Sequence, residues 1–573
     1  MLIKKDVKKI IIVCALIMMS LVMLLILPLG HDLWFHIYRI GAMAEELKLN
    51  PWQIPIRMLS VSYNGYGYGA ALYYGDLFLY IPAILVCLGM DEVLAYKVLS
   101  VLILWGTFGI AYFSARYIKK GKDIAMLFAA FYTFSSTALL NLCVRTAIGE
   151  SQALMVLPLV AVSFGEILYG EKRRSNWMLL GIGMSIIVMS HMLSLSLSVI
   201  ALSVWCLIEI KKLFEEKRII EVMKGAVFAV GLSASFLFSI VEQMLFQKVQ
   251  IPGNNEYQKQ AFVDYAVDWM DYFIPYEVKK ILVSLFSLSW DIETWHPGTI
   301  GLFVLILLGA MWILKPTLSK REKGVLLGSV VTLLLLSIKP VVSIGKEFMS
   351  FMEFPWRVMP IITLGLCISA VWILENSKSM DDKKNKVTCY MLIGTLLIAG
   401  WAVGPRYAYQ LYVQRDDYAY IRENNPDYYE KYLISYTPNP GDNMYLPEGV
   451  WLYTYEERGE TIIPNKEDIE FEWKRESERI QIQIIDNPYS DTTLELPLYM
   501  YKGYVAKNSK GDKFPVVLSE NGLASIEVGD YEGDINVYYG GTLIQKVSDV
   551  ITTITLLMGV SILIVGKRKM KRI

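Results

Sequence analysis

The chain is built from repeated apolar runs separated by clusters of Lys and Arg, and this alternation restricts its fold more than any other feature. Of its 573 residues, 54% are hydrophobic, which is above the usual apolar share of a soluble domain. Apolar runs of about 18 residues or more are typical of membrane-spanning helices. The sequence therefore predicts a polytopic α-helical membrane protein.

The basic clusters predict on which side of the membrane each loop lies. Cytoplasmic loops carry an excess of Lys and Arg, so we expect all seven clusters to be cytoplasmic. They span residues 4–9, 116–122, 172–174, 211–218, 315–323, 378–386 and 567–572. About twelve spans then bring both termini to the cytoplasm, at 9–29, 93–116, 123–142, 150–169, 176–190, 193–210, 222–244, 300–314, 324–340, 357–375, 387–405 and 546–566. The first span lacks an A-x-A-like cleavage site and is expected to be a retained signal anchor.

Two apolar segments, 176–210 and 77–90, could cross the membrane in more than one way. A single helix over 176–210 would put basic residues on both sides of the membrane, so we expect two short spans that turn at His191. The segment 77–90 has about 14 apolar residues, which is short for a span. We expect it to lie in the outer interface or to be re-entrant.

Residue composition divides the chain into a membrane-embedded part, a polar part and a C-terminal segment. Residues 1–405 are expected to form a transmembrane module, with 30–92 as its first outer loop and interfacial helices. Residues 406–545 show short alternating runs such as RIQIQII and TTLELPLYMY between turn residues, which predicts an extracytoplasmic β-sandwich-like domain. Residues 546–573 form the final span and a basic tail. None of the six cysteines lies in 406–545, which excludes a disulfide framework there. The net charge of zero gives no indication of a nucleic-acid partner.

Ionisable residues gather on the predicted outer face. Burying an ionisable side chain near a bilayer costs several kcal/mol unless the side chain is paired or hydrated. One hydrated cavity that contains all of these residues is therefore a simpler explanation than a separate local environment for each. The candidates for phosphate binding or cavity lining are Arg39, Arg57, Arg145, Glu150, His191, Glu242 and Arg357, with His36, Asp76 and Glu353 as secondary candidates.

Asp32 is the candidate catalytic residue, because it follows the first span closely and could accept a proton from an attacking hydroxyl. The competing interpretation is that Asp32 caps the helix that starts in DLWFHIYRI, since Asp is a preferred N-cap residue. On that helix His36 and Arg39 share a face with Asp32.

The other candidates also have structural alternatives. Arg145 and Glu150 could form a surface salt bridge, Arg357 could snorkel to the headgroups, and His191 could be a structural residue at a helix turn. The run YNGYGYGAALYYG suits a loop that folds closely over a ligand. His31 and His36 lack a third histidine, so no metal motif is evident, and the cofactor, including a divalent metal, stays unknown.

Several motifs resemble the GT-C superfamily of membrane glycosyltransferases, and within it bacterial YfhO-like proteins and those grouped as membrane 6-pyruvoyl-tetrahydropterin synthase-related proteins. They are HDLWFHIYRI, GYGYGAALYYGDLFLYIP, RTAIGESQALMVLPL, SHMLSLSL, FMEFPWRVMP and LELPLYMYKGYVAKNSKGD. The resemblance implies that Asp32 matches the acidic residue of the first outer loop, and that Arg357 contacts the donor phosphate. The chain departs from the pattern because it has no clear DxD motif. Pterin chemistry is not expected, because the three-histidine spacing is missing.

The resemblance implies a polyprenyl-phosphate-sugar-dependent glycosyltransferase at the outer face of the bacterial cytoplasmic membrane. Its partners would be the lipid-linked sugar, membrane lipids, and an envelope glycan, lipid or protein as acceptor. The alternative is a non-catalytic envelope protein, such as a lipid-linked-sugar flippase, a transporter or an assembly scaffold.

Overall fold

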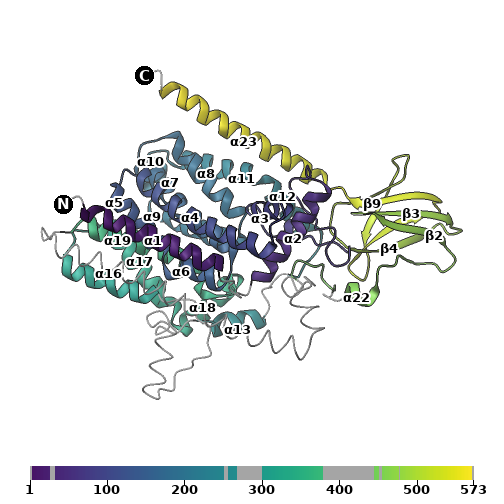
Figure 1. Ribbon diagram of the computed structural model, residues 1–573, viewed down its shortest axis with the longest axis horizontal. Coiled ribbons are helices and arrows are strands. Elements are labelled where there is room, and N and C mark those ends of the chain that lie inside the picture. The colour runs from purple at the N-terminus through teal and green to yellow at the C-terminus, as the bar shows by residue number, and fades with distance from the viewer. Residues whose placement is uncertain are drawn as a thin grey trace, which may run out of the picture.

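The computed structural model describes residues 3–25, 32–250, 256–266, 300–377, 444–450, 454–476 and 478–570. They form a helical body, a β-domain at one end of it, and a long C-terminal helix (Figure 1). The described chain is therefore mostly helical with a C-terminal β-sheet region, and this part of the fold class that the sequence predicts is confirmed.

The helices of the described residues differ widely in length. In chain order they are α1 (Ile3–Leu25), α2 (Leu33–Leu49), η1 (Ala70–Leu72), α3 (Tyr80–Cys87), α4 (Glu92–Tyr117), α5 (Lys122–Thr133), α6 (Ser136–Leu139), η2 (Leu140–Val144), α7 (Ile148–Tyr169), α8 (Arg174–Val188), α9 (Met192–Ile208), α10 (Ile210–Glu215), α11 (Ile219–Leu232), α12 (Ala234–Phe246), α13 (Glu256–Asp264), α16 (Ile300–Leu314), α17 (Lys320–Leu336), α18 (Lys339–Met349), η3 (Ser350–Met352), η4 (Pro355–Val358), α19 (Met359–Glu375), α22 (Thr454–Arg458) and α23 (Leu543–Met570).

Local signals explain where some of these helices begin. The Asp91 carboxylate accepts a hydrogen bond of 3.0 Å from the Leu94 N–H at the start of α4. Ser319 and Glu322 form a reciprocal capping box at the start of α17. Both arrangements satisfy N–H groups that have no partner within the helix.

Among the described residues, four helices are long and apolar enough to cross a membrane: Glu92–Tyr117, Ile148–Tyr169, Pro355–Glu375 and Leu543–Ile562. Three further pairs of helices, bent by 49°, 75° and 95°, would raise the number to seven if each pair is one span. The predicted spans 123–142, 222–244 and 324–340 overlap these bent pairs, so each of them contains a bend that the sequence did not indicate. The predicted span 387–405 lies outside the described residues.

The apolar segments 176–210 and 77–90 both contain helices that are too short or too broken to form one long span. The segment 176–210 is broken into α8 and α9, and His191 is the N-cap residue of α9, as predicted for the turn. The segment 77–90 contains α3, which has 8 residues. At about 1.5 Å per residue, α3 is too short to cross a bilayer.

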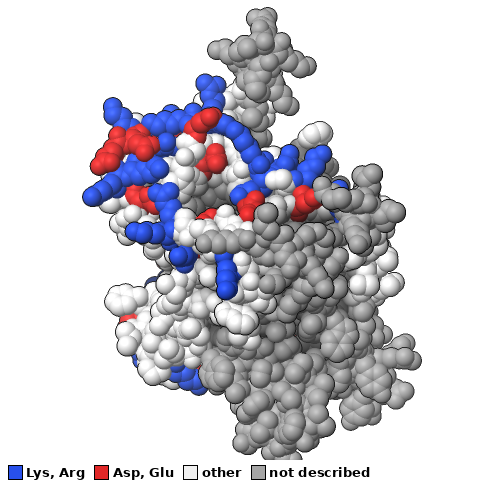
Figure 2. Space-filling view, turned by 90° about the vertical axis from the view of Figure 1, so that its left-hand side faces the viewer, with Lys and Arg blue, Asp and Glu red and all other residues white. Residues whose placement is uncertain are grey.

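Basic residues gather at the end of the body that lies opposite the β-domain. Figure 2 shows Lys and Arg side chains concentrated on part of this end. Contacts at this end join turns that are distant in sequence. Lys120 Nζ lies 2.5 Å from Glu375 Oε2, and Arg321 Nε lies 3.2 Å from Glu209 Oε1. Lys172 Nζ donates to the Glu216 carbonyl oxygen. Four of the predicted basic clusters therefore share one end of the molecule.

The β-domain is a sandwich of two antiparallel sheets. Their orders are β1-β4-β8-β7 and β2-β3-β9-β5-β6. In β3, Ile480, Ile482 and Ile484 are buried, while the intervening glutamines face away from the core, as the period of two along a strand requires. The strands are β1 (Ile463–Pro464), β2 (Glu470–Glu476), β3 (Arg479–Asp486), β4 (Thr492–Tyr499), β5 (Tyr504–Lys507), β6 (Lys513–Phe514), β7 (Val516–Leu518), β8 (Leu523–Gly529) and β9 (Gly533–Tyr539).

The glycine- and tyrosine-rich run of the first outer loop packs against this β-domain. The Tyr499 N–H donates to the Tyr66 carbonyl oxygen at 2.9 Å, and Arg475 donates to the Gly65 carbonyl oxygen. Gly65 has φ +86°, and a Cβ there would collide with Arg475. The run therefore joins the two parts of the protein at this point, where the sequence suggested a cover over a ligand.

Gly75 allows the same loop to pack against the turn between α8 and α9. A Cβ on Gly75 would lie 2.1 Å from the Met189 carbonyl oxygen. We expect Gly75→Ala to lower the free energy of unfolding by about 1–3 kcal/mol, the usual cost of overpacking. Thermal unfolding of the full chain in detergent measures this change. Gly109→Ala is the control, because a Cβ there meets nothing within 4 Å, and equal melting temperatures for the two variants would contradict the packing.

Candidate functional site

Eight of the predicted site residues lie together in what we call the central cluster. They come from the first half of α2 and its N-cap, the end of η2, the first turn of α7, the turn between α8 and α9, the connection between η3 and η4, and η4 itself. Its members are Asp32, His36, Arg39, Arg145, Glu150, His191, Glu353 and Arg357.

A buried ion pair between Arg145 and Glu150 lies at the centre of the cluster. Arg145 Nη1 donates to Glu150 Oε2 at 2.7 Å, and Nη2 donates to Oε1 at 3.1 Å. Both side chains are only 7% exposed. The Arg145 guanidinium also lies 4.2 Å from the centre of the Trp356 ring, a favourable cation–π distance. The bidentate geometry fixes the orientation of both groups, so the surface salt bridge considered from the sequence is in fact an interior one.

Arg357 extends this pair toward Glu353. Its Nε lies 3.5 Å from Glu150 Oε1, and its Nη2 donates to Glu353 Oε2 at 2.7 Å. Burial is the main cause that raises the pKa of Glu353, and Arg357 partly offsets it. Arg357 is 11% exposed, so within the described structure it points into the protein and does not snorkel outward.

Arg39 and His36 are buried next to this network with donors that have no acceptor. Each residue is 1% exposed. Arg39 Nη2 donates to the carbonyl oxygens of Tyr74 and Gly75, both at 3.3 Å. Among the described residues, Arg39 Nη1 and both ring nitrogens of His36 have no hydrogen-bond partner. Burial, and then the Arg39 charge, lower the pKa of His36 well below its usual value. Unsatisfied buried donors are costly, so these groups are suited to an anionic or polar ligand.

Asp32 lies at the edge of the same network. Its backbone N–H donates to the Arg145 carbonyl oxygen at 3.5 Å. It occupies the N-cap position of α2, yet its side chain makes no capping hydrogen bond to that helix. The capping interpretation therefore accounts for its position in the chain but not for its carboxylate.

His191 has the structural role considered from the sequence and also faces the cluster. The Ser194 N–H donates to His191 Nδ1 at 3.2 Å, which caps α9. Burial lowers the pKa of His191 to about 4, so the imidazole is neutral at pH 7. Because Nδ1 accepts, the proton of this neutral ring is on Nε2.

Asp76 adds a half-buried carboxylate near Arg39. Burial raises the pKa of Asp76 to about 6, and the Arg39 charge opposes this rise. Its Oδ2 has no hydrogen-bond partner within the described part of the chain. Asp76 is thus a neighbour of the cluster that is not tied into its ion pairs.

Two tyrosines that no sequence pattern singled out connect the cluster. The Tyr74 ring lies 5.9 Å from the His36 ring and 6.1 Å from the His191 ring, between centroids. A Cβ on Gly149 would lie 2.3 Å from the Tyr74 hydroxyl, so this hydroxyl lies directly beside the residue that precedes Glu150. Tyr445 packs on Tyr74 at 6.2 Å. Both tyrosines belong to tyrosine-rich stretches, where nothing in the sequence distinguishes them from their neighbours.

Three of the eight described non-glycine residues with positive φ lie at or beside the cluster. Thr146 has φ +57°, Glu353 has φ +63° and Tyr445 has φ +65°. Non-glycine residues in this region cost of order 1–3 kcal/mol each and occur preferentially at functional sites. All three are members or direct neighbours of the cluster, which favours a functional role over a purely structural one.

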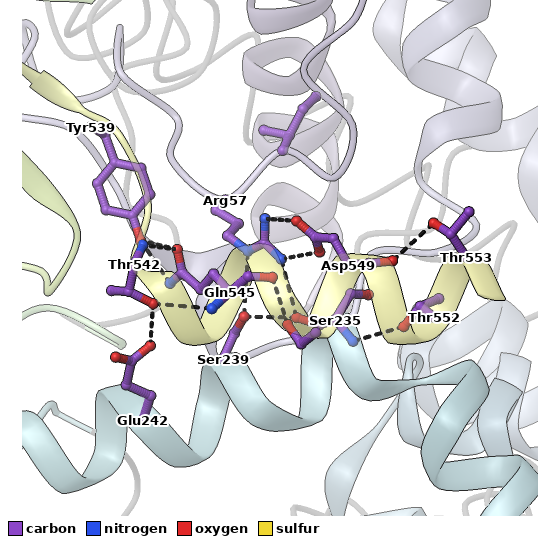
Figure 3. Close-up of polar contacts among 12 residues, drawn as sticks. Arg57, Ser235, Ser239, Glu242, Tyr539, Thr542, Gln545, Asp549, Thr552 and Thr553 are labelled. Carbon is purple, nitrogen blue, oxygen red and sulfur yellow. Dashed lines mark hydrogen bonds and ion pairs between the residues drawn. The ribbon is translucent and has the colours of Figure 1, made fainter. Parts of the chain in front are cut away.

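The structure gives Arg57 and Glu242 other partners, in what we call the α12–α23 junction (Figure 3). Arg57 Nη2 donates to Asp549 Oδ1 at 2.5 Å and Nη1 donates to Oδ2 at 3.1 Å. Thr542 donates to Glu242 Oε2 at 2.5 Å, and Lys502 Nζ lies 3.3 Å from Glu242 Oε1. These contacts hold α23 and the end of the β-domain on α12, so Arg57 and Glu242 are engaged in a separate group of contacts and do not join the central cluster.

We expect Asp549→Asn to weaken the attachment of α23. The Arg57 guanidinium would lose a partner that is worth about 1.5–3 kcal/mol when charged, reduced here because Asp549 is 32% exposed. Limited proteolysis of the full chain should therefore release C-terminal fragments faster. Lys546→Gln, an exposed change on the same helix, is the control. Equal cleavage rates in both variants would contradict the role of the junction.

The described residues contain no group of three or more His, Cys, Asp or Glu side chains arranged to hold a metal ion. The central cluster instead offers arginine and histidine donors to a ligand.

Comparisons with known proteins give distant similarities. No family model and no curated protein matches the sequence. Among solved structures, the arabinofuranosyltransferase AftD from Mycobacteria is 13% identical over 69% of this chain, with a TM-score of 0.39, and the match covers 26% of AftD. The chain thus spans about a quarter of the length of that protein. ArnT from Cupriavidus metallidurans, bound to undecaprenyl phosphate, is 13% identical over 64% of this chain and 78% of its own, with a TM-score of 0.32.

Proposed function

We propose that this protein is a GT-C-type glycosyltransferase that uses a polyprenyl-phosphate-linked sugar, with the central cluster as its active site. The observation that carries the proposal is the set of buried, unsatisfied donors on Arg39 and His36 beside the Arg145–Glu150–Arg357 network. Arginine donors match the geometry of a phosphate. The motifs that resemble the GT-C superfamily include the segments that carry these residues.

The proposed reaction is an inverting transfer in one step. Asp32 accepts the proton of the acceptor hydroxyl while the hydroxyl oxygen forms a bond to the anomeric carbon of the sugar. The bond from that carbon to the phosphate oxygen breaks, and polyprenyl phosphate leaves with the electron pair. Arg39 and Arg357 stabilise the negative charge that develops on the phosphate. Glu150 holds Arg145 and Arg357 in place.

We propose that the reaction takes place at the outer face of the bacterial cytoplasmic membrane. The helix α7 has Glu150 in its first turn and ends at Tyr169, just before the basic residues Lys172 and Arg173. Its 22 residues span roughly 33 Å, about the thickness of the hydrocarbon core. Because basic loops are cytoplasmic, this spacing supports an outer position for the central cluster and cytoplasmic termini.

Mass spectrometry of envelope glycans from parent and deletion cells tests the function. We expect one sugar decoration to disappear in the deletion strain and the lipid-linked donor to accumulate. Complementation with the full chain should restore the parent profile. An unchanged glycan profile would overturn the proposed transfer. A donor that accumulates on the cytoplasmic leaflet would instead identify a flippase.

A further inference from the structure

Arg39, which the proposed mechanism assigns to the phosphate, lies between two aromatic rings. Its guanidinium carbon is 5.0 Å from the centre of the Phe35 ring and 4.8 Å from the centre of the Tyr74 ring. Both distances are within the range of cation–π attraction, about 6 Å. Phe35 and Arg39 share a face of α2, whereas Tyr74 belongs to the loop that follows η1. The two rings therefore restrict where the Arg39 guanidinium can point.

Tyr445 packs against both of these rings. Its ring centroid is 6.3 Å from that of Phe35 and 6.2 Å from that of Tyr74. The Phe35 and Tyr74 rings are themselves 5.5 Å apart. All three separations are typical of aromatic pairs, about 4.5–7 Å. The three rings are thus in mutual contact, and we call Phe35, Tyr74 and Tyr445 the aromatic box.

The backbone around Tyr445 is held by segments that are distant in sequence. The Tyr445 N–H donates to the Gln250 carbonyl oxygen at 2.8 Å, and the Gln250 N–H donates to the Leu446 carbonyl oxygen at 2.8 Å. The Tyr501 hydroxyl donates to the Tyr445 carbonyl oxygen at 2.9 Å. With φ +65°, Tyr445 has a conformation that is uncommon for a residue with a side chain. These hydrogen bonds keep it there, and its ring is thereby presented to the box.

Arg39 has one donor available for a ligand. Its Nη2 donates to the carbonyl oxygens of Tyr74 and Gly75, both at 3.3 Å, whereas its Nη1 has no hydrogen-bond partner among the described residues. A donor that already points in the required direction needs no reorganisation when negative charge appears beside it. The orientation of the Arg39 guanidinium is therefore the property on which phosphate binding depends, and the aromatic box fixes it.

We propose that Tyr445 is a positioning residue, which acts through the Phe35 and Tyr74 rings to hold Arg39 in the orientation that binds the phosphate of the lipid-linked donor. The proposal rests on the glycosyl transfer proposed above and adds to its phosphate site a residue from the segment before the β-domain. Tyr445 takes no part in the bond changes. Because its ring carries the role, phenylalanine can replace it.

Binding of undecaprenyl phosphate to the full chain in detergent, measured by isothermal titration calorimetry, tests this role. We expect Tyr445→Ala to raise the dissociation constant about 10-fold, a change within the usual range of coupling between residues in contact. Tyr445→Phe should bind as the parent protein does. Tyr531→Ala is the matched control, because it removes a ring that contacts Phe514 at 4.7 Å within the β-domain. It should leave the dissociation constant unchanged.

A double-variant cycle with Arg39 shows whether Tyr445 acts through that arginine. Arg39→Gln should weaken binding at least as much as Tyr445→Ala, and adding Tyr445→Ala to Arg39→Gln should have no further effect. A general loss of folding would instead lower binding equally in both backgrounds, and that result would overturn the positioning role. Binding by Tyr445→Phe that is as weak as binding by Tyr445→Ala would also overturn it.

Failure of the proposed function gives a different set of results. If the parent protein does not bind undecaprenyl phosphate, both proposals fall. If the parent protein binds it and Tyr445→Ala binds it equally well, only the role of Tyr445 falls. If Asp32→Asn keeps full transfer while the cycle shows coupling between Tyr445 and Arg39, the proposed base falls and the role of Tyr445 stands.

Discussion

Replacing Asp32 with Asn is expected to reduce sugar transfer by about 10²–10⁴-fold, the usual contribution of a general base. The amide cannot accept a proton, but it has almost the same size as the carboxylate. Because the Asp32 side chain makes no capping hydrogen bond to α2, the substitution should leave that helix intact. Transfer is measured with purified protein and an extract that contains lipid-linked donor, with the melting temperature recorded in parallel.

The control for this variant is Asp530→Asn, which changes an exposed carboxylate in the β-domain. It should retain full transfer and the same melting temperature. Full activity of Asp32→Asn would remove Asp32 as the base. A lower activity together with a lower melting temperature would assign it a structural role.

Removing the Glu150 side chain is expected to have the largest effect on stability. In Glu150→Ala, the Arg145 guanidinium stays buried without its bidentate partner. Breaking a buried pair in this way costs about 3–5 kcal/mol. Glu45→Gln is the control, because the Glu45–Lys48 pair is about half exposed and such pairs contribute at most about 1 kcal/mol. Denaturant unfolding of the detergent-solubilised chain measures both.

A double variant separates stability from function at this pair. Replacing both charges with apolar residues of similar volume is often neutral for stability, so Arg145→Met with Glu150→Leu should recover much of the stability that Glu150→Ala loses. It should not recover transfer, because Arg145 and Glu150 organise the central cluster around Arg357. A double variant with full transfer would show that the pair serves packing alone.

The sequence by itself determined the classes of structure and many candidate residues. Hydropathy is a local property, so the apolar helices could be predicted from short windows. The turn at His191 followed from placing the basic residues on both sides of 176–210 in the cytoplasm. The alternation in RIQIQII was sufficient for a β-strand, because one face of β3 is buried in the sandwich. A charged residue next to an apolar segment also indicated a candidate site residue, because a buried charge needs an ion-pair partner or has a functional role. It selected Arg145, Glu150 and Arg357, which are in contact in the structure.

Only the tertiary structure decided which of these residues are neighbours. Arg57 pairs with Asp549, which is 492 residues away, and no local pattern encodes that choice. The same is true of the contact between the Tyr66 segment and β4, and of the bends that divide three predicted spans. Hydropathy records how much apolar surface a segment must bury. Which partner satisfies a charge depends on packing between distant segments, and this separates the central cluster from the α12–α23 junction.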